Sequence, residues 1–184
     1  NDHRIDGTVV VPGVMAVEGF AEAASILRPD LAVVSVEDLA FEAPLKLYRN
    51  QPRRAIVRLV PTIDRQGPVL LATLETTRTL VGDRQQTVHP YRARIRQDRE
   101  YPKWTLEPPP NTSSGRDIQR DDIYRAYFPG PSFQVLHKVS EGPDGTTAGW
   151  MQTGTETPPM GRPARLSAAP MYTELAFQAA GIVE

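Results

Sequence analysis

The feature that most constrains the fold is an internal repeat: the segment that follows residue 12 returns in similar form near residue 170. Only the first copy is preceded by a histidine, because Pro159 stands at the position that matches His3. The repeat predicts two related halves, and a single His with one distant carboxylate suggests one acid/base site. The matched positions are Met15 and Met171, Glu18 and Glu174, Glu22 and Gln178, and the pairs 23–24 and 179–180.

The first half predicts one helix and an antiparallel sheet. Residues 13–27 follow Pro12, end before Arg28-Pro29, and place Val14, Val17, Phe20, Ala21 and Ala24 on one face. Segments rich in Val, Leu, Ile and Thr are typical of strands, and close connections favour pairing of successive strands as a meander. The expected strands lie near 31–42, 53–63, 69–81 and 86–97.

The second half is separated by a Pro-rich stretch over 101–115, which is expected to be a stiff linker. Beyond it we expect a short helix near 121–127, strands near 133–141 and 146–153, and an apolar helix from Pro170. The predicted domains are therefore 1–98, the linker 99–116, and 117–184. Because the second half has fewer strands than the first, we expect a trimmed domain of a larger protein.

Composition limits the chemistry. With 184 residues, 40% of them hydrophobic, the chain can bury one substantial core or two small ones. It has no Cys and three scattered His residues, so a thiolate nucleophile is excluded and a metal centre is not expected. A net charge of −1 gives no general attraction to nucleic acid. The lack of a long apolar run predicts no membrane association and a cytoplasmic location.

Three short motifs stand out along the chain. His3, Gly7 and Pro12 fit His-x-x-x-Gly-x-x-x-x-Pro. The run Tyr127-Phe-Pro-Gly-Pro-Ser-Phe-Gln is similar to a Tyr-Gly-Pro-x-Phe motif, with Pro129 in place of Tyr. Glu174 and Gln178 are similar to Asp-x-x-x-Gln/His, with Glu for Asp. Together these motifs resemble those of the dehydratase domains of polyketide and fatty acid synthases, and the run from Ile123 to Phe128 is most similar to the iterative and polyunsaturated-fatty-acid types.

This resemblance implies an α+β double hot-dog fold, in which two helix-wrapped antiparallel sheets form a pseudo-dimer whose second half is incomplete here. It implies dehydration of a 3-hydroxyacyl thioester to the trans-2-enoyl thioester, with His3 as base and Glu174 as acid. No cofactor is implied, since the phosphopantetheine arm of an acyl carrier protein presents the substrate. The expected partners are that carrier protein, other domains of a multidomain synthase, and a second copy in a homodimer.

Other residues are candidates for support. Gln178 lies one helical turn after Glu174 and could orient its carboxyl group. Gly7 and Gly13 could contact the substrate carbonyl, although a turn and close helix packing explain them equally well. The candidate substrate tunnel consists of Pro12, Tyr127, Gly130, Pro131 and Phe133, and a purely structural bend at 129–133 is equally compatible with the sequence.

Several alternatives stay open at this point. Related single-hot-dog hydratases use a Glu at the place of Glu18, which makes Glu18 a rival acid. A same-fold isomerase, product-template-like cyclase or thioesterase could use the same His and carboxylate, and a degenerate dehydratase could serve as a structural or dimerisation module. Arg92, Arg94 and Arg96 share one strand face and could meet an acidic carrier protein or form a solvated outer face. His89 and His137 have no visible partner in the sequence and are expected to be structural or exposed.

Overall fold

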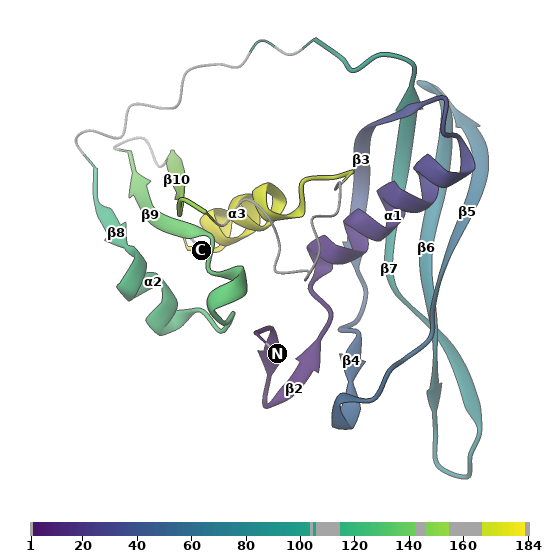
Figure 1. Cartoon of the computed structure of the whole chain (residues 1–184), viewed down its shortest axis with the longest axis horizontal. Coiled ribbons are helices and arrows are strands. Elements are labelled where there is room, and N and C mark those ends of the chain that lie inside the picture. The colour runs from purple at the N-terminus through teal and green to yellow at the C-terminus, as the bar shows by residue number, and fades with distance from the viewer. Residues whose placement is uncertain (1, 104, 106–114, 143–145, 155–166, 183–184) are drawn as a thin grey trace. The chain divides into compact units, whose positions relative to one another are not determined.

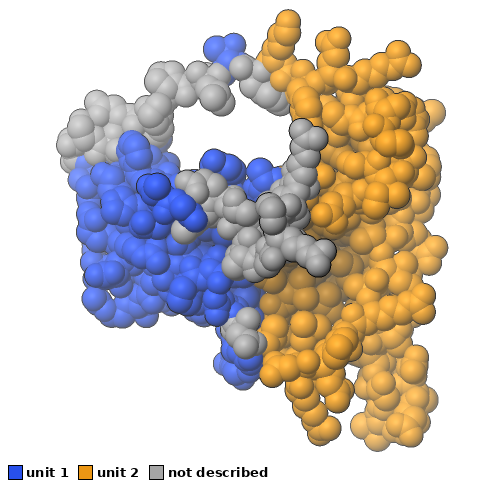
Figure 2. Space-filling model, viewed as in Figure 1, with its two compact units in different colours: residues 1–7, 104–165, 169–184 blue, residues 8–103, 166–168 orange. Residues whose placement is uncertain are grey.

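The computed structural model describes residues 2–103, 105, 115–142, 146–154 and 167–182. By contacts the chain forms two compact units, which Figure 2 colours separately. Unit 1 comprises residues 1–7, 104–165 and 169–184, and unit 2 comprises residues 8–103 and 166–168. The first seven residues, which include His3, therefore group with the C-terminal part of the chain.

Unit 2 is built on a four-stranded antiparallel sheet in the order β3-β7-β6-β5 (Figure 1). The expected meander is confirmed for its last three strands, β5 (Ala55–Asp64), β6 (Gly67–Thr79) and β7 (Gln85–Asp98). It is wrong for β3 (Ala32–Phe41), which pairs with β7 rather than β5. The connection from β3 to β5 is diverted through β4 (Lys46–Leu47), which pairs with β2 (Thr8–Val10).

Helix α1 (Gly13–Leu27) covers one face of this sheet, with the bounds that the sequence predicts. The five residues expected on its apolar face are all buried. Ala16, Phe20 and Ala24 recur at a four-residue spacing, so they meet the sheet as one stripe. Alternate residues of the two central strands complete the core, because successive strand side chains point to opposite faces. These strand residues are Leu70, Ala72, Leu74, Tyr91, Ala93 and Ile95.

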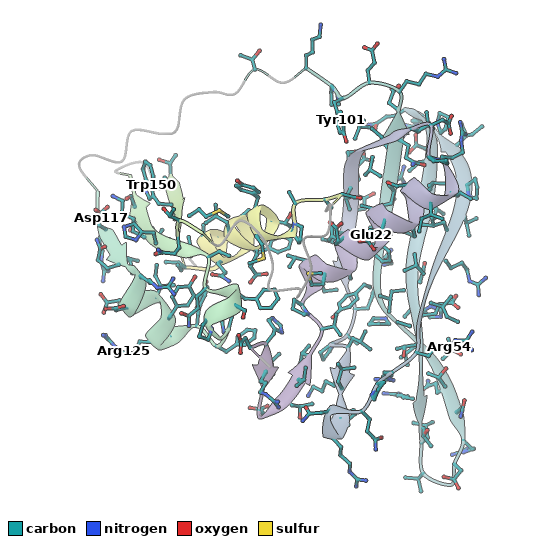
Figure 3. All side chains as sticks on the ribbon, in the orientation of Figure 1. Glu22, Arg54, Tyr101, Asp117, Arg125 and Trp150 are labelled. Atoms are coloured by element: carbon teal, nitrogen blue, oxygen red, sulfur yellow. The ribbon has the colours of Figure 1, made fainter. Side chains whose placement is uncertain are left out.

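Unit 1 contains a three-stranded sheet in the order β10-β9-β8 and two helices. The strands are β8 (Asp117–Gln119), β9 (Leu136–Glu141) and β10 (Thr147–Met151). A polar row crosses them, in which Trp150 donates to Ser140 Oγ at 3.3 Å and Ser140 donates to Asp117 at 2.6 Å; Figure 3 labels Trp150 and Asp117. Helix α2 (Arg120–Ala126) packs on β8 and β9, and helix α3 (Pro170–Gly181) packs on β9 and β10.

Two expectations for this unit need correction. The strand expected from residue 133 begins only at Leu136, because Pro131–Phe133 form a short 3₁₀ helix. The strand β8 was not predicted, since three residues are too few to show alternation. The same holds for β1 (Arg4–Ile5), β2 and β4. The predicted linker 99–116 falls largely on residues outside the described ones.

The repeat appears as one helix packed on an antiparallel sheet in each unit. Helix α1 packs on the sheet of unit 2, and helix α3 packs on the sheet of unit 1. Met171 is fully buried and Met15 is partly buried, so the matched methionines both face inward to some degree. The repeated helices therefore place Glu18 and Glu174 at equivalent turns of two different units.

Candidate active site

His3 lies in unit 1 against two aromatic rings of the segment that follows α2. Its imidazole meets the ring of Phe128 edge-on at 4.9 Å between centroids and that of Phe133 at 5.8 Å. Edge-to-face packing of this kind fixes the plane of a ring as well as its position. The His3 side chain is partly buried, so it is held in place and still reachable.

Asp2 ties the histidine segment to the same turn. Its carbonyl oxygen accepts the Gly130 N–H at 2.5 Å, and its carboxylate accepts the N–H and hydroxyl of Ser132. The Ser132 hydroxyl holds the pKa of Asp2 below its ordinary value. A Cβ added at Gly130 would lie 2.9–3.0 Å from Asp2 atoms, so glycine permits this close approach. His3 is therefore positioned by its neighbour Asp2.

Glu174 lies on α3 of the same unit and is partly buried. Burial raises the pKa of Glu174, and a hydrogen bond from Gln178 opposes part of that rise. A carboxyl group with a raised pKa keeps its proton closer to neutral pH than an exposed glutamate does. Glu174 thus has the property that a general acid needs.

Gln178 is the centre of a hydrogen-bonded cluster. Its side chain is 5% exposed, and its amide nitrogen donates to Glu174 Oε1 at 2.6 Å and to the Phe133 carbonyl at 2.8 Å. Its amide oxygen accepts from the Tyr124 hydroxyl at 2.7 Å. The buried amide therefore connects α3 to α2 and to the 131–133 turn.

Phe133 connects the two members of the candidate acid/base pair, His3 directly and Glu174 through Gln178. Its ring packs against His3, and its carbonyl accepts from Gln178, which also binds Glu174. His3, the candidate base, and Gln178, which binds the candidate acid, are thus both held by Phe133 within unit 1. This juxtaposition is the strongest structural argument for an acid/base site.

The candidate tunnel residues of unit 1 surround this cluster. Tyr127 donates its hydroxyl to the Gln178 backbone carbonyl at 3.1 Å. Pro131 and Phe133 form the 3₁₀ helix, and Gly130 accommodates Asp2. Both a tunnel wall and a structural bend are compatible with this arrangement.

The other candidate residues show mainly backbone roles. Gly7 has a φ of 75° in the turn between β1 and β2, and its carbonyl accepts from Arg4 at 2.7 Å. Pro12 precedes α1, and a Cβ at Gly13 would lie 2.6 Å from the Phe41 ring. Pro12 and Gly13 belong to unit 2, so their contribution to the site remains a prediction.

The rival acid, Glu18, is in a different environment. It is 2% exposed, and its two carboxylate oxygens accept the N–H groups of Ser167 and Ala168 at 2.6 and 2.8 Å. Both oxygens are therefore used as acceptors of backbone donors. This arrangement favours a structural carboxylate that anchors the segment before α3.

The three arginines of β7 lie on one face of the strand, as the alternation predicts, and each is paired within unit 2. Such pairing supports the interpretation of a solvated outer face. His89 and His137 are both exposed. The ion pairs are Arg92 with Glu42, Arg94 with Asp38 and Asp64, and Arg96 with Glu37 and Asp64.

Sequence reasoning missed the residues that position the others: Asp2, Tyr124, Phe128 and Ser132. Asp2 and Ser132 are 130 positions apart, so no local pattern links them. Tyr124 lies inside the run that carries part of the family resemblance, and its three-residue spacing from Tyr127 predicts that both lie on one face of the helix expected over 121–127. That spacing was the available signal for Tyr124.

Among the described residues, no three His, Asp or Glu side chains lie close enough to hold a metal ion. No helix in the described part of the chain is both long and apolar enough to cross a bilayer.

The position of His3 can be tested at Gly130. Gly130→Ala places a methyl group against Asp2 and should detach the segment, at a cost of about 1–3 kcal/mol in unfolding free energy by urea denaturation. The NMR shifts of the His3 ring protons, set by the Phe128 and Phe133 rings, should then approach those of an unstructured histidine. Gly19→Ala is the matched control, because its Cβ meets no atom within 4 Å. Unchanged His3 shifts in a folded Gly130→Ala protein would contradict this account.

Comparison with known proteins shows what the sequence and the fold of this chain are similar to. Residues 1–87 match the model described as "Polyketide synthase dehydratase domain". No curated protein matches the chain in sequence. In structure, the chain is similar to the dehydratase domain from the CurF module of the Curacin polyketide synthase, with a TM-score of 0.74 and 19% identity over 100% of this chain and 65% of that one.

Two further solved structures agree. The dehydratase domain of the polyketide PpsC from Mycobacterium tuberculosis gives a TM-score of 0.67 and 19% identity, over 98% of this chain and 62% of that one. An isomerase-inactive variant of a GphF dehydratase domain gives 0.66 and 22%, over 98% and 60%. The chain thus spans less than two thirds of the length of these three domains. The chain therefore has the α+β hot-dog fold of these dehydratase domains over part of their length, and its residues 1–87 match their family model.

Proposed function

We propose that this chain belongs to a dehydratase that removes water from a 3-hydroxyacyl thioester and releases the trans-2-enoyl thioester. The observation that carries the proposal is the juxtaposition at Phe133. The ring of this residue packs on His3, and its carbonyl shares a buried amide donor with Glu174. A base and an acid held by one turn suit a reaction that takes a proton from one carbon and delivers one to a neighbouring hydroxyl.

His3 and Glu174 carry out different steps of the reaction. Neutral His3 takes the proton from C2, and the electron pair of that C–H bond forms the C2–C3 double bond. The C3–O bond breaks, and Glu174 donates its proton to the leaving hydroxyl, which departs as water. The resulting imidazolium and carboxylate exchange a proton through solvent before the next turnover.

The environment of Glu174 supports its role as the acid. An ordinary exposed glutamate is almost fully ionised at pH 7, since its pKa is about 4.3. Burial raises the pKa of Glu174, so a larger fraction carries the proton that the leaving hydroxyl needs. Gln178 orients the carboxyl group, and its hydrogen bond opposes the rise in the pKa of Glu174.

The substrate is presented by the phosphopantetheine arm of an acyl carrier protein, and the protein itself needs no cofactor. Gly7 offers backbone contact to the thioester carbonyl, and Phe133 lines the acyl path with Tyr127, Gly130 and Pro131. A polyketide-type synthase supplies the carrier and the neighbouring domains, with a homodimer in the cytoplasm as the expected setting.

Dehydration is tested by mass spectrometry of a 3-hydroxyacyl carrier protein after incubation with the full-length protein. The intact protein should remove one water, and His3→Ala and Glu174→Gln should each lower turnover by about a hundredfold or more. Glu22→Gln and His137→Ala are matched controls, because both residues are exposed. An unchanged substrate with the intact, folded protein across several acyl lengths would favour the structural-module interpretation.

The protonation of Glu174 can be measured directly by carboxyl 13C NMR. Its pKa should lie above that of exposed glutamates, because burial disfavours the charged form. Gln178→Leu should raise it further, since the hydrogen bond that favours the carboxylate is lost. As the acid acts in its protonated form, kcat should fall as pH rises through this value. A Glu174 signal that titrates with the exposed glutamates would rule out the proposed acid.

The rival acid is distinguished by Glu18→Gln. This change removes one acceptor and sets an amide N–H₂ against a backbone N–H, at a cost of about 1–3 kcal/mol in unfolding free energy. Dehydration by the folded protein should stay near that of Glu22→Gln, which alters an exposed residue of the same helix. Loss of dehydration without loss of folding would assign the acid to Glu18.

A second candidate function is double-bond isomerisation on the same scaffold. It is favoured by the similarity to a GphF dehydratase domain whose variant is described as isomerase-inactive. The same base and acid can move a proton between two carbons without losing water. A product of unchanged mass and altered NMR spectrum from an enoyl substrate would identify this activity.

A further inference from the structure

Tyr124 is a partly buried residue that binds Gln178, the partner of the candidate acid, and no motif of the sequence assigns a role to it. It lies on α2, and its hydroxyl oxygen accepts the Leu136 N–H at 2.7 Å. The same hydroxyl donates to the Gln178 amide oxygen at 2.7 Å. The hydroxyl thus connects the start of β9 to the amide that binds Glu174.

The direction of these hydrogen bonds is fixed at both ends. The Leu136 N–H can only donate, so it occupies an acceptor position of the Tyr124 hydroxyl and leaves the phenolic proton for Gln178. The Phe133 carbonyl can only accept, so the amide nitrogen of Gln178 must face it. With both ends fixed, the second amide proton points to Glu174 Oε1 at 2.6 Å.

The fixed direction of these hydrogen bonds affects which oxygen of Glu174 carries its proton. Oε1 of Glu174 receives a hydrogen bond from an amide group that cannot accept a proton in return. The hydrogen bond therefore favours the carboxyl proton on Oε2, because the carbonyl oxygen of a protonated carboxyl group is a better acceptor than its hydroxyl oxygen. An acid whose proton sits on one defined oxygen is oriented before the substrate arrives.

We propose that Tyr124 is a positioning residue that acts through Gln178 to place the acidic proton of Glu174 on Oε2. The proposal rests on the proposed function of Glu174. Tyr124 is well suited to the task, because burial raises its pKa to about 12 and keeps the hydroxyl a donor across the physiological range. The Arg120 guanidinium, 5.0 Å above the ring centroid, adds to the packing of the phenol.

The test is Tyr124→Phe in the full-length protein, which removes only the hydroxyl. We expect kcat for dehydration to fall about tenfold or more while KM stays within about twofold, since the acid is misaligned and substrate contacts are kept. Tyr172→Phe, an exposed tyrosine on the helix of Glu174, is the matched control and should be unchanged. A folded Tyr124→Phe protein with normal kcat overturns the proposal.

A double-mutant cycle separates positioning from general structural damage. If Tyr124 acts through Gln178, Tyr124→Phe should cost little further in a Gln178→Leu background. Equal losses of kcat in both backgrounds would show that Tyr124 acts independently of Gln178 and would also overturn the proposal.

The Gln178 amide gives a measurement that needs neither activity nor a folded variant. In the intact protein its two side-chain N–H protons should be well separated in shift and slow to exchange with solvent, since both are bound. Averaged, rapidly exchanging signals would contradict the fixed amide. If the intact protein fails to dehydrate but these protons are protected, the proposed function fails while the hydrogen-bonded arrangement stands.

Discussion

The side-chain amide of Gln178 holds together the segments on which the candidate site is built. This amide is almost fully buried. Without hydrogen-bond partners it would lower the free energy of unfolding, because its N–H groups and its oxygen would lose their bonds to water and gain none in the protein. Its partners come from α2, from the 131–133 turn and from its own helix. The position of Glu174, the orientation of the amide and the location of Phe133 are thus consequences of satisfying one polar group.

The repeat places a glutamate in two different environments at matched positions. At the matched position of α1, Glu18 is surrounded by two backbone N–H donors, which use both of its oxygens. On α3, Glu174 receives one amide donor and is otherwise desolvated, so its pKa rises. One turn further along, exposed Glu22 is matched by buried Gln178. The two halves therefore share a backbone plan and differ in the donors that reach the carboxylate.

Much of the fold could be predicted from the sequence, because it depends on local periodicity. Helix 13–27 has a four-residue apolar repeat and lies between Pro12 and Pro29. The long strands run for ten or more residues, and β6 and β7 place alternate residues in the core. The place of β3 beside β7 could not be predicted, since it depends on the β4 diversion. Strands of two or three residues carry no periodic signal.

The candidate site was only partly predictable. The motifs named His3, Glu174, Gln178 and Phe133, and the i, i+4 spacing anticipated the Glu174 to Gln178 hydrogen bond. The groups that hold them were missed, because Asp2 with Ser132 and Tyr124 with Gln178 are paired only by tertiary folding. Sequence patterns indicate which side chains carry chemistry, and long-range hydrogen bonds decide how they point.

The proposal that His3 and Glu174 form one acid/base site is tested most directly by a crystal structure of the full-length protein. The ligand is a non-reactive amide analogue of a 3-hydroxyacyl phosphopantetheine thioester. We expect a ring nitrogen of His3 to lie against C2 of the acyl chain and Oε2 of Glu174 to lie against the C3 hydroxyl. An analogue whose C3 hydroxyl lies on Glu18, or that binds away from both His3 and Glu174, would contradict it.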